Sequence, residues 1–188
     1  MKALISALAM ALALTGCSLP AQLKSSPSVR YYVLSSPLPA GSTSENAGIG
    51  VLPVTLPGYL TRQQIVLRDA DGVNIPLHEF DRWGESLGQG ISRVLCDSLA
   101  VRGIPALPLR TGAKVSEKLM LDVRRLDGAL EGNVTIDVVW RLQRDGDVLK
   151  SGHFVKSRPA GDSLQSMVEA ESLLVQDLAD NIAQAVRR

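Results

Sequence analysis

The segment from Asn133 to Ser157 alternates polar and apolar residues on both sides of a turn dipeptide, Asp145-Gly146. Because the side chains of a strand point alternately to opposite faces, this spacing predicts strands with one buried face. Asp-Gly is typical of the tight turn of a β-hairpin. The segment therefore predicts an antiparallel hairpin packed on a core, whose buried residues in the first strand are Val134, Ile136, Val138, Trp140 and Leu142.

Two other segments repeat apolar residues at the spacing of a helix. In the first, Asp81 can cap the start, and Gly103 followed by Pro105 favours a stop. In the second, Asp162 with Gln165 three residues later is typical of a helix start, and the apolar stripe extends to about Val186. The stripe of the first predicted helix consists of Trp83, Leu87, Ile91, Val94, Leu95 and Leu99.

Short apolar or alternating runs predict the remaining strands, over residues 29–36, 49–57, 64–68, 74–80, 104–110 and 118–128. Asp71-Gly72 favours a second hairpin between the third and fourth of these runs. The second run is apolar on both faces, which favours a central strand, although Pro53 favours an edge or a bulge. The order of elements predicts an α+β fold with two helices packed on one face of a mostly antiparallel mixed sheet. We expect one domain over residues 29–188, whose opposite sheet face is open to solvent or to a partner.

The first sixteen residues are typical of a signal peptide. Lys2 precedes an apolar run, Ala3 to Leu14, that is too short to span a membrane. Thr15-Gly16 before Cys17 resembles the lipobox of bacterial lipoproteins. On that resemblance residues 1–16 are removed, and the Cys17 thiol carries a lipid whose acyl chains include palmitate. Several acyl chains at about 0.8 kcal/mol per buried methylene hold a protein permanently in a bilayer.

The residues after Cys17 bear on where the protein is located. Residues 17–28 are polar with two prolines, so they predict a lipidated tether. Ser18 takes the position at which aspartate usually retains a lipoprotein at the inner membrane. By that resemblance we expect the protein in the outer membrane, facing the periplasm.

Charge and cysteine content exclude some partners. Removal of residues 1–16 takes Lys2 from the 20 basic residues, which leaves 19 against 19 acidic ones and a formal net charge of zero. A nucleic-acid partner requires a clustered basic face, so we expect none. Cys96 has no partner for a disulfide within the mature chain, and we expect a small core residue rather than a reactive thiol.

Gly84-Glu85-Ser86-Leu87-Gly88 matches the Gly-x-Ser-x-Gly string of serine hydrolases. Such a serine sits in a strained turn before a helix and needs a later histidine, for which His153 is the candidate. Because the predicted helix starts near Trp83, Ser86 falls inside its first turns, and hairpins do not make a parallel hydrolase sheet. We therefore predict no catalytic residue, and a serine esterase using Ser86 is the alternative function.

Patterns for metal and cofactor binding are also missing from the sequence. His78 and His153 have no second histidine or cysteine at ligand spacing. The sequence contains no phosphate loop and no dinucleotide fingerprint. We therefore predict neither a metal site nor a cofactor.

Four segments together resemble the paraquat-inducible protein C family of ABC-type transport auxiliary lipoproteins. They are the lipobox, Tyr31 to Pro37, Ile49 to Arg68, and Arg82 to Leu99. The resemblance implies that a Pro-Gly-Tyr-Leu turn joins two strands and that Trp83 opens a helix. The family's usual alanine and proline after this tryptophan are Gly84 and Ser86 here, which creates the hydrolase string.

Members of that family accompany MCE-type (mammalian cell entry) lipid transporters, whose periplasmic subunits bridge two membranes. The resemblance implies a non-enzymatic subunit that docks the conduit to the outer membrane, supports membrane integrity and forms a homo-oligomer. For contact with the MCE subunit we expect the turn Pro57, Gly58, Tyr59 and Leu60, because apolar residues in a turn often mark an interface. Folding of Tyr59 and Leu60 back onto the core is the alternative. A lipid-binding or assembly lipoprotein of another envelope machine is a further alternative function.

Overall fold

The computed structural model describes residues 27–37, 48–69, 72–109 and 115–187. The predicted signal peptide, Cys17 and most of the predicted tether lie outside these ranges. The described residues form eight strands, two α-helices and one short 3-10 helix. This is the α+β class that the sequence predicts.

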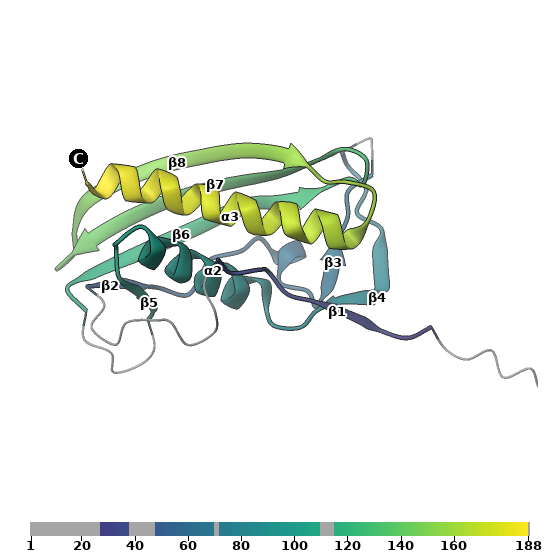
Figure 1. Ribbon diagram of the computed structural model, residues 1–188, viewed down its shortest axis with the longest axis horizontal. Helices are drawn as coiled ribbons and strands as arrows, with labels where there is room; N and C mark the ends of the chain where they lie inside the picture. Colours follow the sequence, from purple (N-terminus) through teal and green to yellow (C-terminus); the bar gives the residue numbers. More distant parts are fainter. Residues whose placement is uncertain (1–26, 38–47, 70–71, 110–114, 188) are drawn as a thin grey trace, which may run out of the picture.

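A five-stranded sheet lies behind the two helices in Figure 1. β6, β7 and β8 are antiparallel, whereas β2 runs parallel to both of its neighbours. β2 is thus internal to the sheet, as its apolar sequence predicts, and it ends before Pro53, which removes the conflict with that proline. The order of the strands is β5 (Ala106–Pro108), β2 (Ile49–Val51), β6 (Glu117–Gly128), β7 (Asn133–Arg144) and β8 (Asp147–Pro159).

The hairpin of β7 and β8 is confirmed. Asp145 and Gly146 connect the strands with φ values of 51° and 97°, the left-handed backbone that a two-residue hairpin turn requires. The five alternating apolar residues of β7 are all buried. Gly152 of β8 lies against Trp140 of β7, and a Cβ on Gly152 would be 2.8 Å from atoms of the indole ring. A residue without a side chain is therefore needed where β8 passes the ring.

A separate three-stranded sheet lies at one end of the molecule (Figure 1), in the order β1 (Arg30–Tyr32), β4 (Leu77–Trp83) and β3 (Gln64–Val66). β3 and β4 are antiparallel, which confirms the second predicted hairpin, and β1 pairs in parallel with β4. Gly72 between β3 and β4 has φ of 73°, while Asp71 lies outside the described residues. The strands thus divide into two sheets, although the chain after β2 still pairs with β6 at Thr55, and Leu67 after β3 pairs with Gly128 at the end of β6.

Two helices, α2 (Leu87–Val101) and α3 (Leu164–Val186), pack against each other on the same face of the five-stranded sheet (Figure 1). This confirms the predicted helical layer. α3 is capped by Ser163, whose hydroxyl accepts a hydrogen bond from the Ser166 amide, so the start lies one residue after the predicted cap at Asp162. In the described ranges, neither helix has the length and apolar character needed to cross a bilayer.

The start of α2 differs from the prediction. Trp83 is the last residue of β4, and Ser86 is the N-cap, whose hydroxyl accepts a hydrogen bond from the Gln89 amide at 3.4 Å. Asp81, the predicted cap, lies inside β4 and binds the Arg30 guanidinium at 2.7 Å. Trp83 is still 6 % exposed, so its side chain joins the core from a strand and not from the helix.

The core lies between the helical layer and the five-stranded sheet. Burial of one large apolar side chain contributes roughly 1.5–3 kcal/mol, so this layer fixes the relative positions of the elements. Many residues of α2, α3 and β7 have 0 % exposure, and they include Ile91, Leu95, Leu99, Leu174, Leu178, Ile182, Val134, Ile136 and Val138.

Candidate functional site

The turn from Pro57 to Leu60 leads from β2 toward β3 and is closed by local hydrogen bonds. The amide of Leu60 donates to the carbonyl of Pro57 at 2.9 Å, and Gly58–Leu60 forms a single 3-10 turn. The Thr61 hydroxyl donates to the carbonyl of Gly58 at 2.8 Å. Pro57 has φ of −65°, which its ring already imposes. The shape of the turn therefore follows from its own sequence.

Tyr59 extends from this turn to a buried carboxylate, Asp127, near the end of β6. The Tyr59 hydroxyl donates to Asp127 Oδ2 at 2.7 Å. Arg68 donates to both carboxylate oxygens, at 2.8 Å from Nε and 2.8 Å from Nη2, and Arg125 Nε donates to Oδ1 at 2.9 Å. The Arg68 guanidinium also lies over the Tyr59 ring, 5.8 Å from its centroid. We call Tyr59, Arg68, Arg125 and Asp127 the Asp127 cluster, and it ties the turn to the five-stranded sheet.

The Asp127 carboxylate is 0 % exposed, yet it stays ionised. Burial alone would raise the pKa of Asp127, but hydrogen bonds from Arg68, Tyr59 and Arg125 hold the pKa below its usual value. Burial and the hydrogen bond to Asp127 raise the pKa of Tyr59 to about 12. The hydrogen bond to Asp127 also raises the pKa of Arg68. At neutral pH the cluster is thus a charged and fully hydrogen-bonded unit.

Glu171 of α3 is an acidic side chain whose titration the cluster affects. It is 2 % exposed, and its Oε2 has no hydrogen-bond partner within the described residues. Burial, followed by the charge of Asp127, raises the pKa of Glu171 well above its usual value. Because an unpaired buried carboxylate is costly, burial favours the neutral form of Glu171.

The structure decides between the two interpretations of the turn for its larger side chains. Leu60 is 2 % exposed, and Tyr59 is half-buried with its hydroxyl on Asp127, so both fold back onto the protein. Gly58 is exposed, and a Cβ at this position would meet no atom within 4 Å. The part of the turn that a partner could contact is therefore the backbone of Pro57 and Gly58 together with part of the Tyr59 ring. Contact with a partner through this surface stays a prediction.

A cleft of about 700 Å³ opens at the start of α2, between this helix and the edge formed by β2 and β5. Ser86 lies at its rim, between strand β4 and helix α2. The strand, turn and helix that a nucleophile elbow requires are thus present, and the predicted place of Ser86 inside the helix is wrong. The lining includes Val51, Pro53, Val54, Pro108 and Leu109 on the strand side and Gln89, Ser92 and Arg93 on the helix side.

The geometry at Ser86 is that of a helix cap. Its φ and ψ of −62° and 139° are ordinary extended backbone, without the strain of an elbow. His153 is hydrogen-bonded to Asp137 at 2.8 Å on the sheet face that the helices do not cover, and His78 lines a different cleft. Among the described residues no hydrogen bond joins Ser86 to either histidine. The arrangement around Ser86 therefore lacks the base that a serine nucleophile needs.

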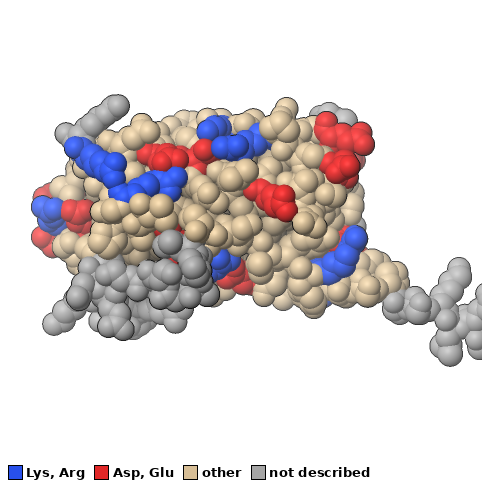
Figure 2. All heavy atoms as spheres, viewed as in Figure 1, with Lys and Arg blue, Asp and Glu red and all other residues tan. Residues whose placement is uncertain are grey.

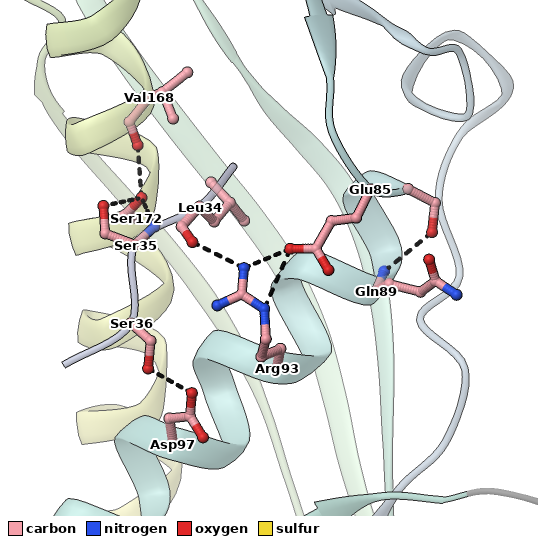
Figure 3. A network of polar contacts seen from close by, with 10 residues as sticks. Leu34, Ser35, Ser36, Glu85, Gln89, Arg93, Asp97, Val168 and Ser172 are labelled. Atoms are coloured by element: carbon pink, nitrogen blue, oxygen red, sulfur yellow. Dashed lines mark hydrogen bonds and ion pairs between the residues drawn. The ribbon is translucent and has the colours of Figure 1, made fainter. Parts of the chain in front are cut away.

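The chain that follows β1 is fastened to both helices (Figure 3). Figure 3 shows this segment lying across α2 and α3. The Arg93 guanidinium, which also pairs with Glu85, donates to a backbone carbonyl of the segment at 2.9 Å. The three contacts are Leu34 with Arg93, Ser35 with Ser172, and Ser36 with Asp97. Three consecutive residues thus fix the N-terminal part of the domain to the helical layer.

The remaining candidate groups are not reactive. Cys96 is buried in α2, and burial raises the pKa of its thiol to about 12, so the thiolate is scarce at neutral pH. Within the ranges that the structure describes, no three His, Cys, Asp or Glu side chains are grouped to hold a metal ion. On the face that Figure 2 shows, most of the surface is uncharged, and Lys and Arg form separate groups, several of them beside Asp and Glu.

The sequence patterns did not indicate the Asp127 cluster. Arg125 lies in a strand that the sequence predicts, and the ladder of this strand, β6, shifts register between Val123 and Arg125. The shift lets Arg125 reach Asp127, which lies in a run of three buried residues at the end of the strand. The burial of Asp127 depends on contacts between distant parts of the chain, so no local pattern indicated that this carboxylate requires partners.

A family model described as the ABC-type transport auxiliary lipoprotein component matches residues 32–183. The match covers most of the described domain, including the turn at Pro57 to Leu60, Ser86 and Asp127. Among curated proteins there is no significant match.

Solved structures share the fold of the domain. One is the crystal structure of an uncharacterized protein, with 22 % sequence identity and a TM-score of 0.71, covering 84 % of this chain and 98 % of that chain. Another is a protein from Xanthomonas campestris, with 16 % identity and a TM-score of 0.66, covering 82 % of this chain and 93 % of that chain. At such identities the likeness shows the architecture alone.

Proposed function

We propose that this chain, which belongs to the family of ABC-type transport auxiliary lipoprotein components, docks an MCE-type lipid-transport conduit to the outer membrane. The family match over residues 32–183 carries the proposal. Membership makes the protein an auxiliary lipoprotein of a transporter. The MCE partner, the outer membrane and the docking role are the steps that we add.

The anchor in this proposal is the lipid on Cys17. The tether of residues 17–28, at roughly 3.3 Å per residue, spans at most about 40 Å, so the domain stands in the periplasm close to the bilayer. Ser18 after the cysteine favours the outer membrane. Apolar lipid crosses an aqueous compartment only along a sheltered path, and a lipid-anchored domain can hold the end of that path at its membrane.

The docking point is the turn at Pro57 to Leu60. The Asp127 cluster fixes this turn from within, so the turn loses little conformational freedom when a partner binds. Its outer surface is backbone-rich and exposed at Gly58. Several copies of the domain, arranged as a ring, would present several such turns to an oligomeric conduit, and we therefore include a homo-oligomer in the proposal.

Gly58→Arg tests this docking point. Because a Cβ at Gly58 would meet no atom within 4 Å, the new side chain fits the folded domain but obstructs a docked partner. We expect loss of cross-linking to the MCE-domain subunit and increased sensitivity of cells to detergent, with an unchanged unfolding temperature. Gln184→Arg is the matched control, because it adds the same side chain at an exposed position of α3 and leaves both measurements unchanged.

The two parts of the proposal fail in different ways. Wild-type cross-linking by the Gly58→Arg protein would contradict the docking point but not the function. A wild-type protein that reaches the outer membrane and never cross-links to an MCE-domain subunit would contradict the function itself.

A further inference from the structure

β1 and the residues on either side of it expose apolar side chains to solvent at the point where the predicted tether joins the domain. Tyr31 is 66 % exposed, Val33 is 54 % exposed and Val29 is 39 % exposed. These residues alternate along the chain, so they share one face of the strand. The residues between them, Arg30 and Tyr32, point the other way and donate hydrogen bonds to Asp81 of β4.

β4 extends this face sideways. Tyr31 pairs in register with Arg82, and Phe80, two residues earlier on β4, is 40 % exposed. Gly84 directly after β4 leaves room for Val33, since a Cβ on Gly84 would lie 3.1 Å from Val33 Cγ1 and 3.9 Å from Tyr31 Cβ. We call this surface the β1–β4 face, and its residues are Val29, Tyr31, Val33, Phe80 and Arg82.

The β1–β4 face differs from the other exposed apolar positions. No other five-residue stretch in the described part of the chain has three exposed large apolar residues at alternating positions. Single exposed apolar side chains are normal on a soluble domain, but a contiguous apolar surface usually marks a binding site.

We infer that the β1–β4 face rests on the surface of the bilayer that holds the lipid anchor, an inference that relies on the proposed anchor at Cys17. Val29 follows Cys17 by 29 − 17 = 12 positions, which at roughly 3.3 Å per residue span at most about 40 Å. The face therefore begins within reach of the membrane. A short tether raises the local concentration of the face at the lipid surface, so weak contacts suffice.

The residue types of this face suit the level of the lipid headgroups. Aromatic rings such as those of Tyr31 and Phe80 are enriched at the membrane–water interface, and valine adds apolar surface beside them. Arg82 is half-buried, and its Nε donates to the Glu79 carbonyl at 3.0 Å, while its terminal nitrogens have no hydrogen bond within the described residues. Those nitrogens can bind lipid phosphates.

This contact orients the domain. The three-stranded sheet lies against the bilayer, at the end of the molecule opposite to the C-terminus (Figure 1). The turn at Pro57 to Leu60 precedes β3 of the same sheet by a few residues. A conduit docked on that turn would therefore have its mouth beside the membrane.

A pair of tryptophan variants tests the inference on the full-length lipidated protein in phospholipid vesicles that contain brominated acyl chains. Val33→Trp places the probe on the β1–β4 face, and Val148→Trp is the matched control at equal exposure, 54 %. Val148 lies at the start of β8, which begins at the opposite end of the molecule (Figure 1). The native Trp83 and Trp140 are 6 % and 1 % exposed, so they contribute a constant background.

We expect the brominated lipid to quench the emission of the Val33→Trp protein roughly twofold more than that of the Val148→Trp protein, with a blue shift. Equal quenching of both variants would overturn the inference. A blue shift that depends on protein concentration and occurs without quenching would assign the face to a second copy of the chain, which also overturns it. Circular dichroism checks folding, and Tyr31→Trp replaces Val33→Trp if the latter does not fold.

Flotation of the same vesicles separates this inference from the proposed function. Wild-type protein and both variants float with the vesicles, whereas Cys17→Ala does not. Flotation without quenching at position 33 would overturn the membrane contact and leave the anchor standing. Wild-type protein that does not float would overturn the anchor and, with it, the inference.

Discussion

Tyr59→Phe removes one hydroxyl from the Asp127 cluster and keeps the ring. The lost hydrogen bond is 2.7 Å long and ends on a carboxylate that is 0 % exposed, so water does not replace the donor. A hydrogen bond to a charged group contributes about 1.5–3 kcal/mol. Since Arg68 and Arg125 still donate to Asp127, we expect the free energy of unfolding to fall by about 2 kcal/mol.

Thermal unfolding followed by circular dichroism measures this change. For a domain of this size each kcal/mol shifts Tm by about 2–4 °C, so the expected decrease is about 4–8 °C. Tyr31→Phe is the matched control: it removes a hydroxyl from a side chain that is 66 % exposed and has no hydrogen bond within the described residues. Its Tm should equal that of the wild type. Equal Tm values for Tyr59→Phe and the wild type would show that the Tyr59 hydroxyl does not stabilise the buried Asp127 carboxylate.

The dependence of this effect on pH identifies its origin. The pKa of Asp127 is lowered in the folded state, so its contribution to stability is present above the unfolded pKa and is lost as pH falls through the folded pKa. The difference between wild type and Tyr59→Phe should therefore shrink as the pH falls below the usual range of aspartate. Urea unfolding measures this difference. If the difference in the free energy of unfolding stays constant in acid, it comes from packing of the ring and not from the hydrogen bond.

Other predictions concern the same cluster and two further positions. The pKa of Tyr59 is raised from 10.0 to about 12, so wild-type stability should fall as pH rises from 10.0 to about 12, and urea unfolding of Tyr59→Phe should lack this part of the decline. Ser86→Ala should lower the free energy of unfolding by about 1 kcal/mol through loss of the N-cap, whereas Ser86→Asp restores the cap without a nucleophile. Both variants should keep wild-type cross-linking to the partner. Loss of function in well-folded Ser86→Asp would support the esterase alternative. Gly152→Ala should lower the free energy of unfolding by roughly 1–3 kcal/mol, because its Cβ would meet the Trp140 ring at 2.8 Å, while Ser151→Ala next to it should be neutral in the same urea titration.

The elements that the sequence predicted well are those with a strong local pattern. β7 and β8 combine strict alternation with an Asp-Gly turn, and the apolar stripe of α3 is long. Such patterns depend on residues that are close in sequence, so they can be recognised without knowing how distant parts of the chain pack. The division of the strands into two sheets depends on which strands pair across long distances, and no local pattern specifies that.

The start of α2 shows why a boundary can be misplaced. Trp83 and Leu87 are four residues apart, which is helical spacing, but a strand end followed by a turn brings both side chains to the same core. Asp81 and Ser86 are both residue types that cap helices, so composition does not distinguish them. Asp81 binds the Arg30 guanidinium, which is 51 positions away in the sequence, and Ser86 caps α2 instead.

The family resemblance located the candidate docking turn in the sequence, but it did not indicate that the Asp127 cluster holds this turn in place. Tyr59 and Leu60 are apolar enough to suit an interface or a core, and the choice depends on Asp127, which is 68 positions from Tyr59. A buried carboxylate that collects one hydroxyl and two guanidinium groups is a tertiary feature. It appears only when β6 is placed beside the turn.

The native mass of the complex purified from membranes in mild detergent tests whether the protein docks an MCE-type conduit. We expect full-length lipidated protein to emerge as an assembly of several copies with an MCE-domain subunit, and we expect Gly58→Arg to release this subunit while Gln184→Arg retains it. A lipidated chain that is recovered alone, or only with other partners, would contradict the claim that it docks such a conduit.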